Sequence, residues 1–402
     1  MTELMTSTKV TRELRPTRRL LLGSGPCNMH PRVLLAMAEA NQGHRDPDMI
    51  EALQDVRAML RTVFRTGNEL TLAITGTGSA AMEAVLVNSV ERAERVVIAV
   101  NGGFGERLAT VADRVGAEVV KVEFPWGEPV LPDKIEETLK RMGGAKVVAM
   151  VHGETSTGLL NPVPDVARIA HEHGALFILD TVSSLGGEEV TVDDWGVDLC
   201  YSATQKCLGV PPGLAPITVS TQALDVIRNR KTKPGSYVFD LLLCNSYWTP
   251  PTAYHHTFPV NLLYGLREGL RMILEEGLER RVKRHADCAA ALRAGLKAMG
   301  LRLVANPGYL FNPLTAVYVP EGTDEARLRR SLLLDHGIEI SGGIGPLAGR
   351  IVRIGLMSDS CHPSSVLACL SALEVCLAEQ GYEVEPGTGL AAAQQAFSLS
   401  RT

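Results

Sequence analysis

The chain has 402 residues, a length that predicts two or three domains rather than one simple core. Hydrophobic residues make up 45% and charged residues 21%, as in ordinary soluble globular proteins. The net charge of -5 gives no electrostatic reason to bind nucleic acid or an acidic membrane. No apolar run approaches the roughly 20 residues that a membrane helix needs.

The first 19 residues form a mildly basic arm, 1–19, which carries charges from Lys9 to Arg19. It lacks the apolar segment of a secretory signal. A transit peptide is the alternative, but Glu3 and Glu13 weigh against it, since such peptides are poor in acids. We therefore expect a loose arm that packs on a partner subunit.

The eight cysteines form no CxxC pair, and no Cys–His spacing resembles a zinc site, so we expect no metal. Cys369 and Cys376 fall two turns apart on one face of a predicted helix, which suits buried small hydrophobic residues. This usage indicates reduced thiols in a cytoplasmic protein.

Strand-like and helical segments alternate between about residues 70 and 220. The apolar runs predict strands at 70–75, 95–100, 117–124, 146–152, 175–180, 199–203 and 215–220. Helical patterns at 79–90, up to Gly116, at 133–142 and at 163–173 lie between them. This alternation predicts an α/β fold with a mostly parallel sheet and helices on both faces, in a large domain of residues 20–275.

From Val260 one long helical pattern continues to about residue 300 and is expected to link two domains. Short strands and helices then predict a small α+β domain at 276–385, with helices at 324–335 and 364–379. The Gly/Ala/Gln/Ser-rich segment 386–402 is expected to be a flexible tail.

Two charged residues end successive buried strands. Asp180 closes "ALFILD", and a carboxylate there needs hydrogen bonds or a positive partner such as a pyridinium nitrogen. Lys206 lies in "YSATQKCLGVPPG", where desolvation would lower its pKa and make it a Schiff-base nucleophile. Taken singly, Asp180 could cap a turn and Lys206 could be a surface lysine. Together, at strand ends where α/β sheets bind ligands, they favour catalysis.

A Gly-rich turn leads into a helix at Thr75–Ala84, "TGTGSAAMEA", and the helix N-terminus would favour a phosphate. Positions 76–81 also satisfy G-x-G-x-x-A, the dinucleotide fingerprint. That fingerprint needs an acid after the next strand, which instead ends at Val100 and Asn101. A single phosphate is therefore the better ligand, and a tight structural turn is the alternative.

Further residues are suited to ligand contact. Phe104, between glycines after a strand, could stack on a ligand or fill a core gap. Thr155, in "VHGETSTGLLNP", could donate a hydrogen bond to a phenolic oxygen or a phosphate, or lie in a plain turn. Arg353 interrupts an apolar strand and could bind a carboxylate, or face water from an edge strand. Tyr254 and Thr257 lie in a loop that could dock on another subunit.

These motifs, in order and spacing from "LLLGSGPCNMHPRV" to "RIVRIGLM", resemble those of the alanine–glyoxylate and serine–glyoxylate (serine–pyruvate) aminotransferases. That family lies in class V of the fold-type I pyridoxal-phosphate enzymes. The resemblance implies a large domain with a mostly parallel, seven-stranded sheet sandwiched by helices, and a small C-terminal α+β domain. It also implies a homodimer with shared active sites.

The resemblance also implies roles for individual residues. Lys206 would hold pyridoxal 5′-phosphate as a Schiff base and move a proton between Cα and C4′, while Asp180 would pair with the pyridinium nitrogen. Arg353 would bind the substrate carboxylate, and the backbone near Gly25 would line the pocket. The other cofactor contacts would come from Thr77, Gly78, Ser79, Phe104, Thr155, Val182 and Gln205, with Tyr254 and Thr257 reaching the neighbouring subunit's site.

The implied reaction is a ping-pong transfer of an amino group from alanine or serine to glyoxylate or pyruvate. The alternatives are a 2-aminoethylphosphonate–pyruvate or pyridoxamine–pyruvate transaminase, which share these motifs, or another class V enzyme that acts on a different amine. Two departures bear on the substrate, since Ser79 replaces a histidine of animal relatives and Ser24 replaces a usual proline. Cysteine desulfurase chemistry would need a mobile cysteine, for which Cys361 is the candidate. A nucleotide-binding Rossmann-like protein is the alternative outside this enzyme class.

Overall fold

The computed structural model describes residues 13–400. Most of the predicted N-terminal arm, residues 1–12, lies outside this range, and residues 13–18 are exposed. No helix in the described range is long and apolar enough to cross a membrane. All eight cysteines are free and buried, including Cys369 and Cys376 as predicted.

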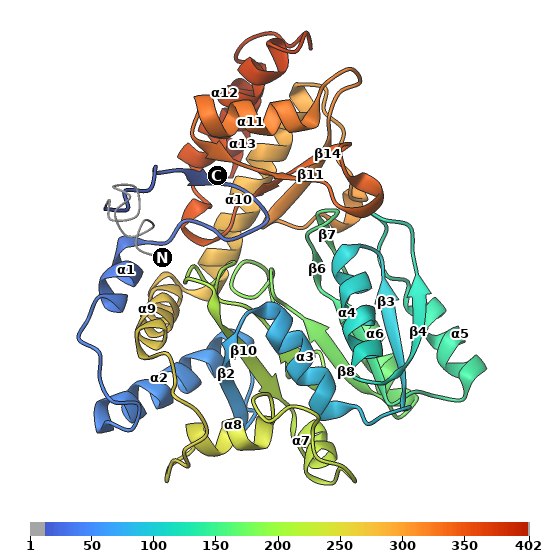
Figure 1. Ribbon diagram of the computed structural model, residues 1–402. Coiled ribbons are helices and arrows are strands. Elements are labelled where there is room, and N and C mark those ends of the chain that lie inside the picture. The colour runs from blue at the N-terminus through green and yellow to red at the C-terminus, as the bar shows by residue number, and fades with distance from the viewer. Residues whose placement is uncertain (1–12, 401–402) are drawn as a thin grey trace, which may run out of the picture.

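Seven strands form the central sheet of the described chain, in the order β2-β10-β9-β8-β5-β3-β4 (Figure 1). Their bounds are β2 (Leu70–Gly76), β3 (Arg95–Val100), β4 (Glu118–Glu123), β5 (Val147–Val151), β8 (Leu176–Asp180), β9 (Leu199–Tyr201) and β10 (Gly213–Val219). Only β10 runs antiparallel to its neighbours, so the predicted mostly parallel sheet is confirmed. β5 is apolar throughout, and β8 is apolar up to its last residue, Asp180, because helices cover both faces of the sheet.

Nine helices of the described chain accompany this sheet. They are α1 (Pro31–Met37), α2 (Pro47–Phe64), α3 (Gly78–Ser89), α4 (Gly103–Arg114), α5 (Pro132–Met142), α6 (Pro164–Glu172), α7 (Thr221–Arg228), α8 (Leu241–Trp248) and α9 (Val260–Glu276). A two-stranded hairpin, β6 (Gly153–Glu154) with β7 (Leu159–Leu160), follows β5. Buried apolar side chains between Val33 and Ile273 form one continuous core around the sheet.

The C-terminal part has its own core, shown at the top of Figure 1. Its elements are β11 (Leu314–Tyr318), β12 (Ile338–Glu339), β13 (Ser341–Gly342), β14 (Ile351–Gly355), α10 (Leu278–Ala298), α11 (Glu325–Asp335), α12 (Pro363–Ala378) and α13 (Thr388–Leu399), with 3-10 turns at Pro307–Tyr309, Gly345–Leu347 and Ser358–Ser360. β1 (Leu20–Leu21) pairs in parallel with β12, and Leu22 belongs to this second core. The segment at 20–22 therefore packs with the C-terminal part, although its sequence position assigned it to the large domain.

Two expectations for this part are wrong. The long helix predicted from Val260 breaks at Gly277, whose φ of 85° lies in the left-handed region that glycine tolerates. The predicted flexible tail contains α13, in which Ala393 is fully buried and Phe397 packs against the second core. Small alanines give α13 an apolar face that the segment's composition concealed. The last two residues, 401–402, lie outside the described range.

Candidate active site

The carboxyl ends of β8 and β9 bring Asp180 and the Lys206 loop together. The two strands are parallel neighbours, with Asp180 in register with Tyr201, and Lys206 follows five residues later. Each charge influences the pKa of the other group, which places both in one electrostatic environment. The edge of the sheet where ligands bind in α/β folds therefore carries both predicted residues.

Asp180 is 3% exposed, and each of its carboxylate oxygens accepts one hydrogen bond. Its Oδ1 accepts from the Val182 amide at 2.8 Å, and its Oδ2 accepts from the Tyr201 hydroxyl at 2.8 Å. Burial raises the pKa of Asp180 to about 6, while the positive charge of Lys206 partly offsets this rise. Asp180 thus caps its turn, as the alternative held, and also presents a desolvated carboxylate. Tyr201 was not singled out from sequence, although a tyrosine in a buried strand needs a polar partner.

Lys206 is held inward and is not the surface lysine of the alternative. Its Nζ donates to the Ser24 carbonyl and lies against Gly25, whose φ is 101° and where any side chain would collide with the amine. Burial lowers the pKa of Lys206 to about 8, and the nearby Arg353 charge acts in the same direction. At a given pH the neutral, nucleophilic form is therefore more populated than in an ordinary lysine.

Hydrogen bonds within the Lys206 loop stabilise one backbone conformation. The Thr204 hydroxyl donates to the Pro211 and Leu214 carbonyls at 2.6 and 3.0 Å. The Gly209 amide donates to the Lys206 carbonyl at 3.0 Å. These hydrogen bonds hold the loop in place although it has no regular secondary structure.

The N-terminus of α3 lies beside both loops. Its N-cap residue, Thr77, makes no capping hydrogen bond with its side chain, so the first amides of the helix lack that partner. A Cβ on Gly78 would approach Val182 Cγ2 to 2.9 Å and Ala203 Cβ to 3.2 Å. Glycine permits this close packing, which places the helix N-terminus, with its preference for a phosphate, next to the segments that carry Asp180 and Lys206.

Two buried polar atoms in this region lack a hydrogen-bond partner among the described residues. They are Thr155 Oγ1 and Gln205 Oε1. A buried polar atom without a partner costs about 1–3 kcal/mol. Both residues belong to the predicted set, and each has a hydrogen bond that a polar ligand could satisfy.

Glu154 organises the other side of the site and was missed from sequence. Its Oε2 accepts from the Phe104 and Gly105 amides at 3.0 and 3.2 Å, and its Oε1 accepts from the Ser156 amide and hydroxyl. Burial raises the pKa of Glu154, and these hydrogen bonds oppose the rise. An acid directly after a buried strand is the same signal that identified Asp180, so Glu154 could have been found.

Arg353 lies on β14, the middle strand of the sheet β11-β14-β13, and is 6% exposed. The alternative of a water-facing edge arginine is therefore wrong. Its Nε donates to the Gly342 carbonyl at 2.7 Å and its Nη1 to the Thr155 carbonyl at 3.1 Å. The guanidinium thus reaches from the small domain to the loop of Thr155, close enough to lower the pKa of Lys206.

Phe104, Tyr254 and Thr257 make fewer contacts with the other predicted site residues. Phe104 is half-buried, and the Arg107 guanidinium lies 4.8 Å from its ring centroid. Tyr254 is 58% exposed and Thr257 is also exposed. No hydrogen bond in the described chain joins either residue to Asp180 or Lys206. Their segment lies beside the end of β2, where His256 Nε2 is 3.1 Å from the Thr75 hydroxyl.

The comparisons with known proteins agree on one protein family. A model of class-V aminotransferases matches residues 22–356. The (S)-ureidoglycine–glyoxylate transaminase of Bacillus subtilis (strain 168) is 40% identical over 96% of this chain and 97% of that protein. The solved structure of an alanine–glyoxylate aminotransferase from Nostoc sp. has a TM-score of 0.90, with 42% identity over 92% of this chain and 98% of its own.

A third neighbour is the pyridoxamine–pyruvate aminotransferase of Mesorhizobium loti. Its structure has a TM-score of 0.92 and 28% identity, and covers 96% of this chain and 99% of its own. These neighbours confirm the fold that the sequence predicts. They contradict the alternative of a Rossmann-like nucleotide-binding protein.

The lowered pKa of Lys206 predicts a distinctive reactivity. Below pH 8 the amine is mostly protonated and unreactive, so its labelling by an amine-specific reagent should rise with pH around a midpoint of about 8, not 10.5. Mass spectrometry of protein freed of bound small molecules would measure labelling at Lys206, with exposed Lys297 as the internal reference. Identical pH profiles for the two lysines would contradict the burial argument.

Proposed function

The chain belongs to the class-V aminotransferase family, and from this premise we propose which cofactor and substrates it uses. Pyridoxal 5′-phosphate is the cofactor and is held through Lys206. The reaction moves an amino group from alanine or serine to glyoxylate or pyruvate by a ping-pong mechanism. The observation that carries this proposal is the buried amine of Lys206 beside the buried carboxylate of Asp180.

The residues present fit this cofactor. The N-terminus of α3, at Thr77, Gly78 and Ser79, would hold the phosphate together with Gln205, whose buried Oε1 lacks a partner in the described chain. Thr155 Oγ1, also without a partner there, would meet the ring oxygen. The Asp180 carboxylate would pair with the ring nitrogen, and Val182 and Phe104 would flank the ring. When bound, the cofactor supplies an electron sink for the bonds at the substrate's α-carbon.

The chain's own groups would then divide the chemistry. Lys206 Nζ, with its lowered pKa, can accept a proton from the substrate's α-carbon and return one. The Arg353 guanidinium would bind the substrate carboxylate, because two of its nitrogens are already fixed by the Gly342 and Thr155 carbonyls and orient the group. The absence of a side chain at Gly25 leaves the space that the Lys206 amine occupies.

The names of the relatives bear on the substrates. The Bacillus and Nostoc proteins named above share glyoxylate, which supports glyoxylate as the acceptor here. Their donors differ, so alanine and serine stand beside ureidoglycine as a donor to be tested. The Mesorhizobium structure supports the pyridoxamine–pyruvate alternative at lower identity. Desulfurase chemistry is disfavoured, because Cys361 is 1% exposed and its contact with Cys288 and its burial hold its pKa well above the ordinary value.

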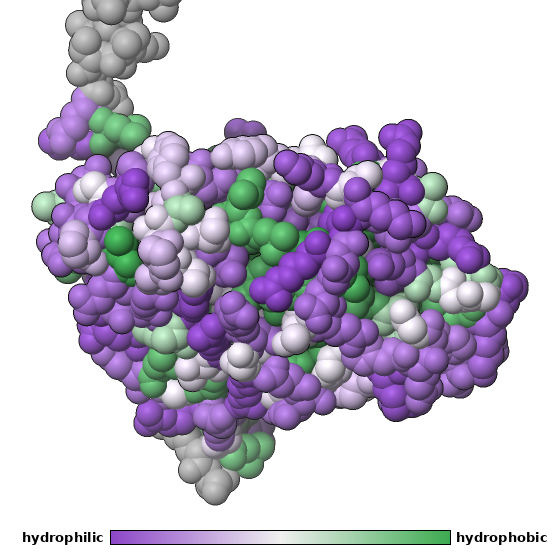
Figure 2. Space-filling model, turned by 90° about the horizontal axis from the view of Figure 1, so that it is seen from below, coloured by the Kyte–Doolittle hydropathy of each residue, from purple (hydrophilic) through white to green (hydrophobic). Residues whose placement is uncertain are grey.

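A second copy of the chain would complete the site. Tyr254 and Thr257 are exposed here, and their hydroxyls would reach the phosphate bound by the partner. Exposed apolar side chains near them, Tyr237, Val238 and Leu243, support such an interface, and Figure 2 shows apolar patches on this underside of the molecule. The eight free thiols support a cytoplasmic setting.

Replacing Lys206 with alanine should remove the bond to the cofactor and the proton carrier together. The wild-type protein should absorb at roughly 410–430 nm, a property of the lysine-bound cofactor, and borohydride should fix the cofactor to Lys206. Lys206→Ala should lose both signals and lower kcat by about 10²–10⁴-fold or more. Lys297→Ala is the control at an exposed lysine. An active Lys206→Ala enzyme would refute the assignment.

A screen of amino donors and acceptors should give the highest kcat/KM for alanine or serine with glyoxylate. Steady-state rates and half-reaction spectra with each donor alone would measure this, with pyruvate as second acceptor. Ureidoglycine, 2-aminoethylphosphonate and pyridoxamine complete the donor set. A clear preference for one of these three would replace the proposed donor while leaving the family intact.

Shared active sites predict complementation between two inactive variants. A mixed dimer of Lys206→Ala with Tyr254→Ala/Thr257→Ala holds one site with both groups intact if the hydroxyls act across the interface. Random mixing should then restore about one quarter of the wild-type sites, because half of the dimers are mixed. Activity after refolding the mixture measures this. No recovery, with dimers formed, would show that the hydroxyls serve their own chain.

A further inference from the structure

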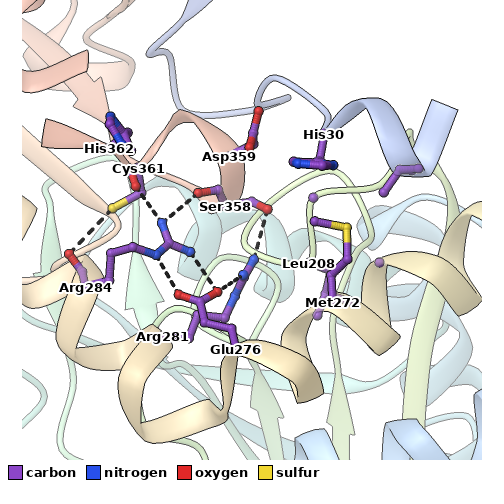
Figure 3. A pocket seen from close by; sticks show the side chains of 13 residues that line it. His30, Leu208, Met272, Glu276, Arg281, Arg284, Ser358, Asp359, Cys361 and His362 are labelled. Atoms are coloured by element: carbon purple, nitrogen blue, oxygen red, sulfur yellow. Dashed lines mark hydrogen bonds and ion pairs between the residues drawn. The ribbon is translucent and has the colours of Figure 1, made fainter. Parts of the chain in front are cut away.

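A buried arginine lies where the two domains meet. Arg281 is in the first turn of α10, just after the break at Gly277, and is 5% exposed. Its Nη1 forms an ion pair of 2.6 Å with Glu276. Figure 3 shows both residues beside a cavity of about 180 Å³ that borders the Lys206 loop at Leu208 and Gly209.

The other nitrogens of Arg281 reach three separate segments of the chain. Nε donates to the Gly186 carbonyl at 2.9 Å, and Nη2 donates to the Cys207 carbonyl at 2.8 Å and to the Ser358 hydroxyl at 2.9 Å. Gly186 lies six residues after Asp180, in the connection between β8 and β9. Cys207 is next to Lys206, and Ser358 follows the strand that carries Arg353.

One guanidinium therefore joins the three segments that carry the proposed site residues. A planar fork with five donors can serve several carbonyls at once, which an ammonium cannot do. The contact with the small domain is also sterically tight. Ser358 has a φ of 49°, unusual for a residue with a side chain, and its hydroxyl occupies the space that a side chain at Gly209 would fill. The Ser358 amide is held in turn by His285 Nε2 at 3.3 Å.

Arg284, one turn further along α10, is a natural comparison. It pairs with the same Glu276 at 2.6 Å and donates to the Ser358 and Cys361 carbonyls at 3.0 and 2.5 Å (Figure 3). Arg284 thus contacts the small domain but makes no hydrogen bond to Gly186 or Cys207. The two arginines share a helix, an ion-pair partner and a neighbour at Ser358, and differ in their contact with the loops of Asp180 and Lys206.

We propose that Arg281 is a positioning residue for amino transfer, which fixes the loops of Lys206 and Asp180 relative to each other and to Arg353. This inference rests on the proposed function. Arg281 touches no reacting atom, and it acts through the backbone next to Lys206. Its removal should misplace the amine, and a displacement of about 1 Å can cost on the order of 100-fold in rate.

The experiment compares Arg281→Lys and Arg281→Met with Arg284→Lys and Arg284→Met in the holoenzyme. The Arg281 variants should lower kcat by on the order of 100-fold with little change in KM. The Arg284 variants should lose comparable thermal stability but keep kcat within a few-fold of wild type. Arg281→Lys keeps the charge beside Glu276, so it carries the test should Arg281→Met fail to fold. Equal losses of kcat at both positions, or full activity of Arg281→Lys, would overturn the proposal.

A second readout does not depend on catalysis. Amide hydrogen exchange of the cofactor-free protein should rise by roughly tenfold or more in segments 183–188 and 204–210 of Arg281→Lys, because their carbonyl anchors are lost. Arg284→Lys should leave these segments unchanged. Unchanged exchange in Arg281→Lys would overturn the proposal. If the wild-type enzyme transfers no amino group, the proposed function fails, and the anchoring of the two loops is judged by exchange alone.

Discussion

An amine and a carboxylate share one desolvated edge of the central sheet, and the architecture around them follows from that constraint. Burial moves the pKa of Lys206 down to about 8 and that of Asp180 up to about 6, so desolvation opposes both charges. Each group is therefore stabilised by hydrogen bonds to neutral polar groups. The Val182 amide and Tyr201 hydroxyl serve Asp180, and the Ser24 carbonyl serves Lys206. Parallel pairing of β8 with β9 makes this arrangement possible, since it delivers two consecutive loops to the same edge.

Two residues of the candidate site, Arg353 and Gly25, are carried by segments that pack with the C-terminal part of the chain. Arg353 arrives on β14 and donates to the Thr155 carbonyl, while Gly25 arrives on the segment that follows β1. β1 itself pairs with β12 of the C-terminal part. A movement of the small domain would therefore carry Arg353 and Gly25 together relative to Lys206. The contacts of Arg281 with Gly186, Cys207 and Ser358 resist such a movement at the opposite side of the Lys206 loop.

The sheet and Asp180 could be predicted from sequence because each follows from a local pattern, an apolar run that in β8 ends in a carboxylate, whereas Lys206 lies five residues beyond the end of β9, in the loop that follows. Glu154 carries the same signal, but its partners are the amides of Phe104 and Gly105, some 50 residues away, and no local pattern shows them. Arg281 stands in the run "ERRVKR", which reads as a solvated helix face until the break at Gly277 turns it inward. Helix α13 was not predicted, because the Gly/Ala/Gln/Ser-rich composition of its segment is typical of a flexible tail, whereas the spacing of its alanines allows an apolar helix face. The roles proposed for Tyr254 and Thr257 would depend on a second copy, whose position one sequence does not describe.

The balance of charge in the site bears on how it can recognise a phosphate. Its ionisable groups are two basic side chains, Lys206 and Arg353, and two acidic ones, Asp180 and Glu154. Because these offset one another, an incoming phosphate gains little from net charge. Neutral donors would then hold a phosphate, and the first amides of α3, which lack a side-chain cap, are suited to this role together with the helix dipole. Arg353 would be left for a substrate carboxylate, so the two anions would not compete for the same cation.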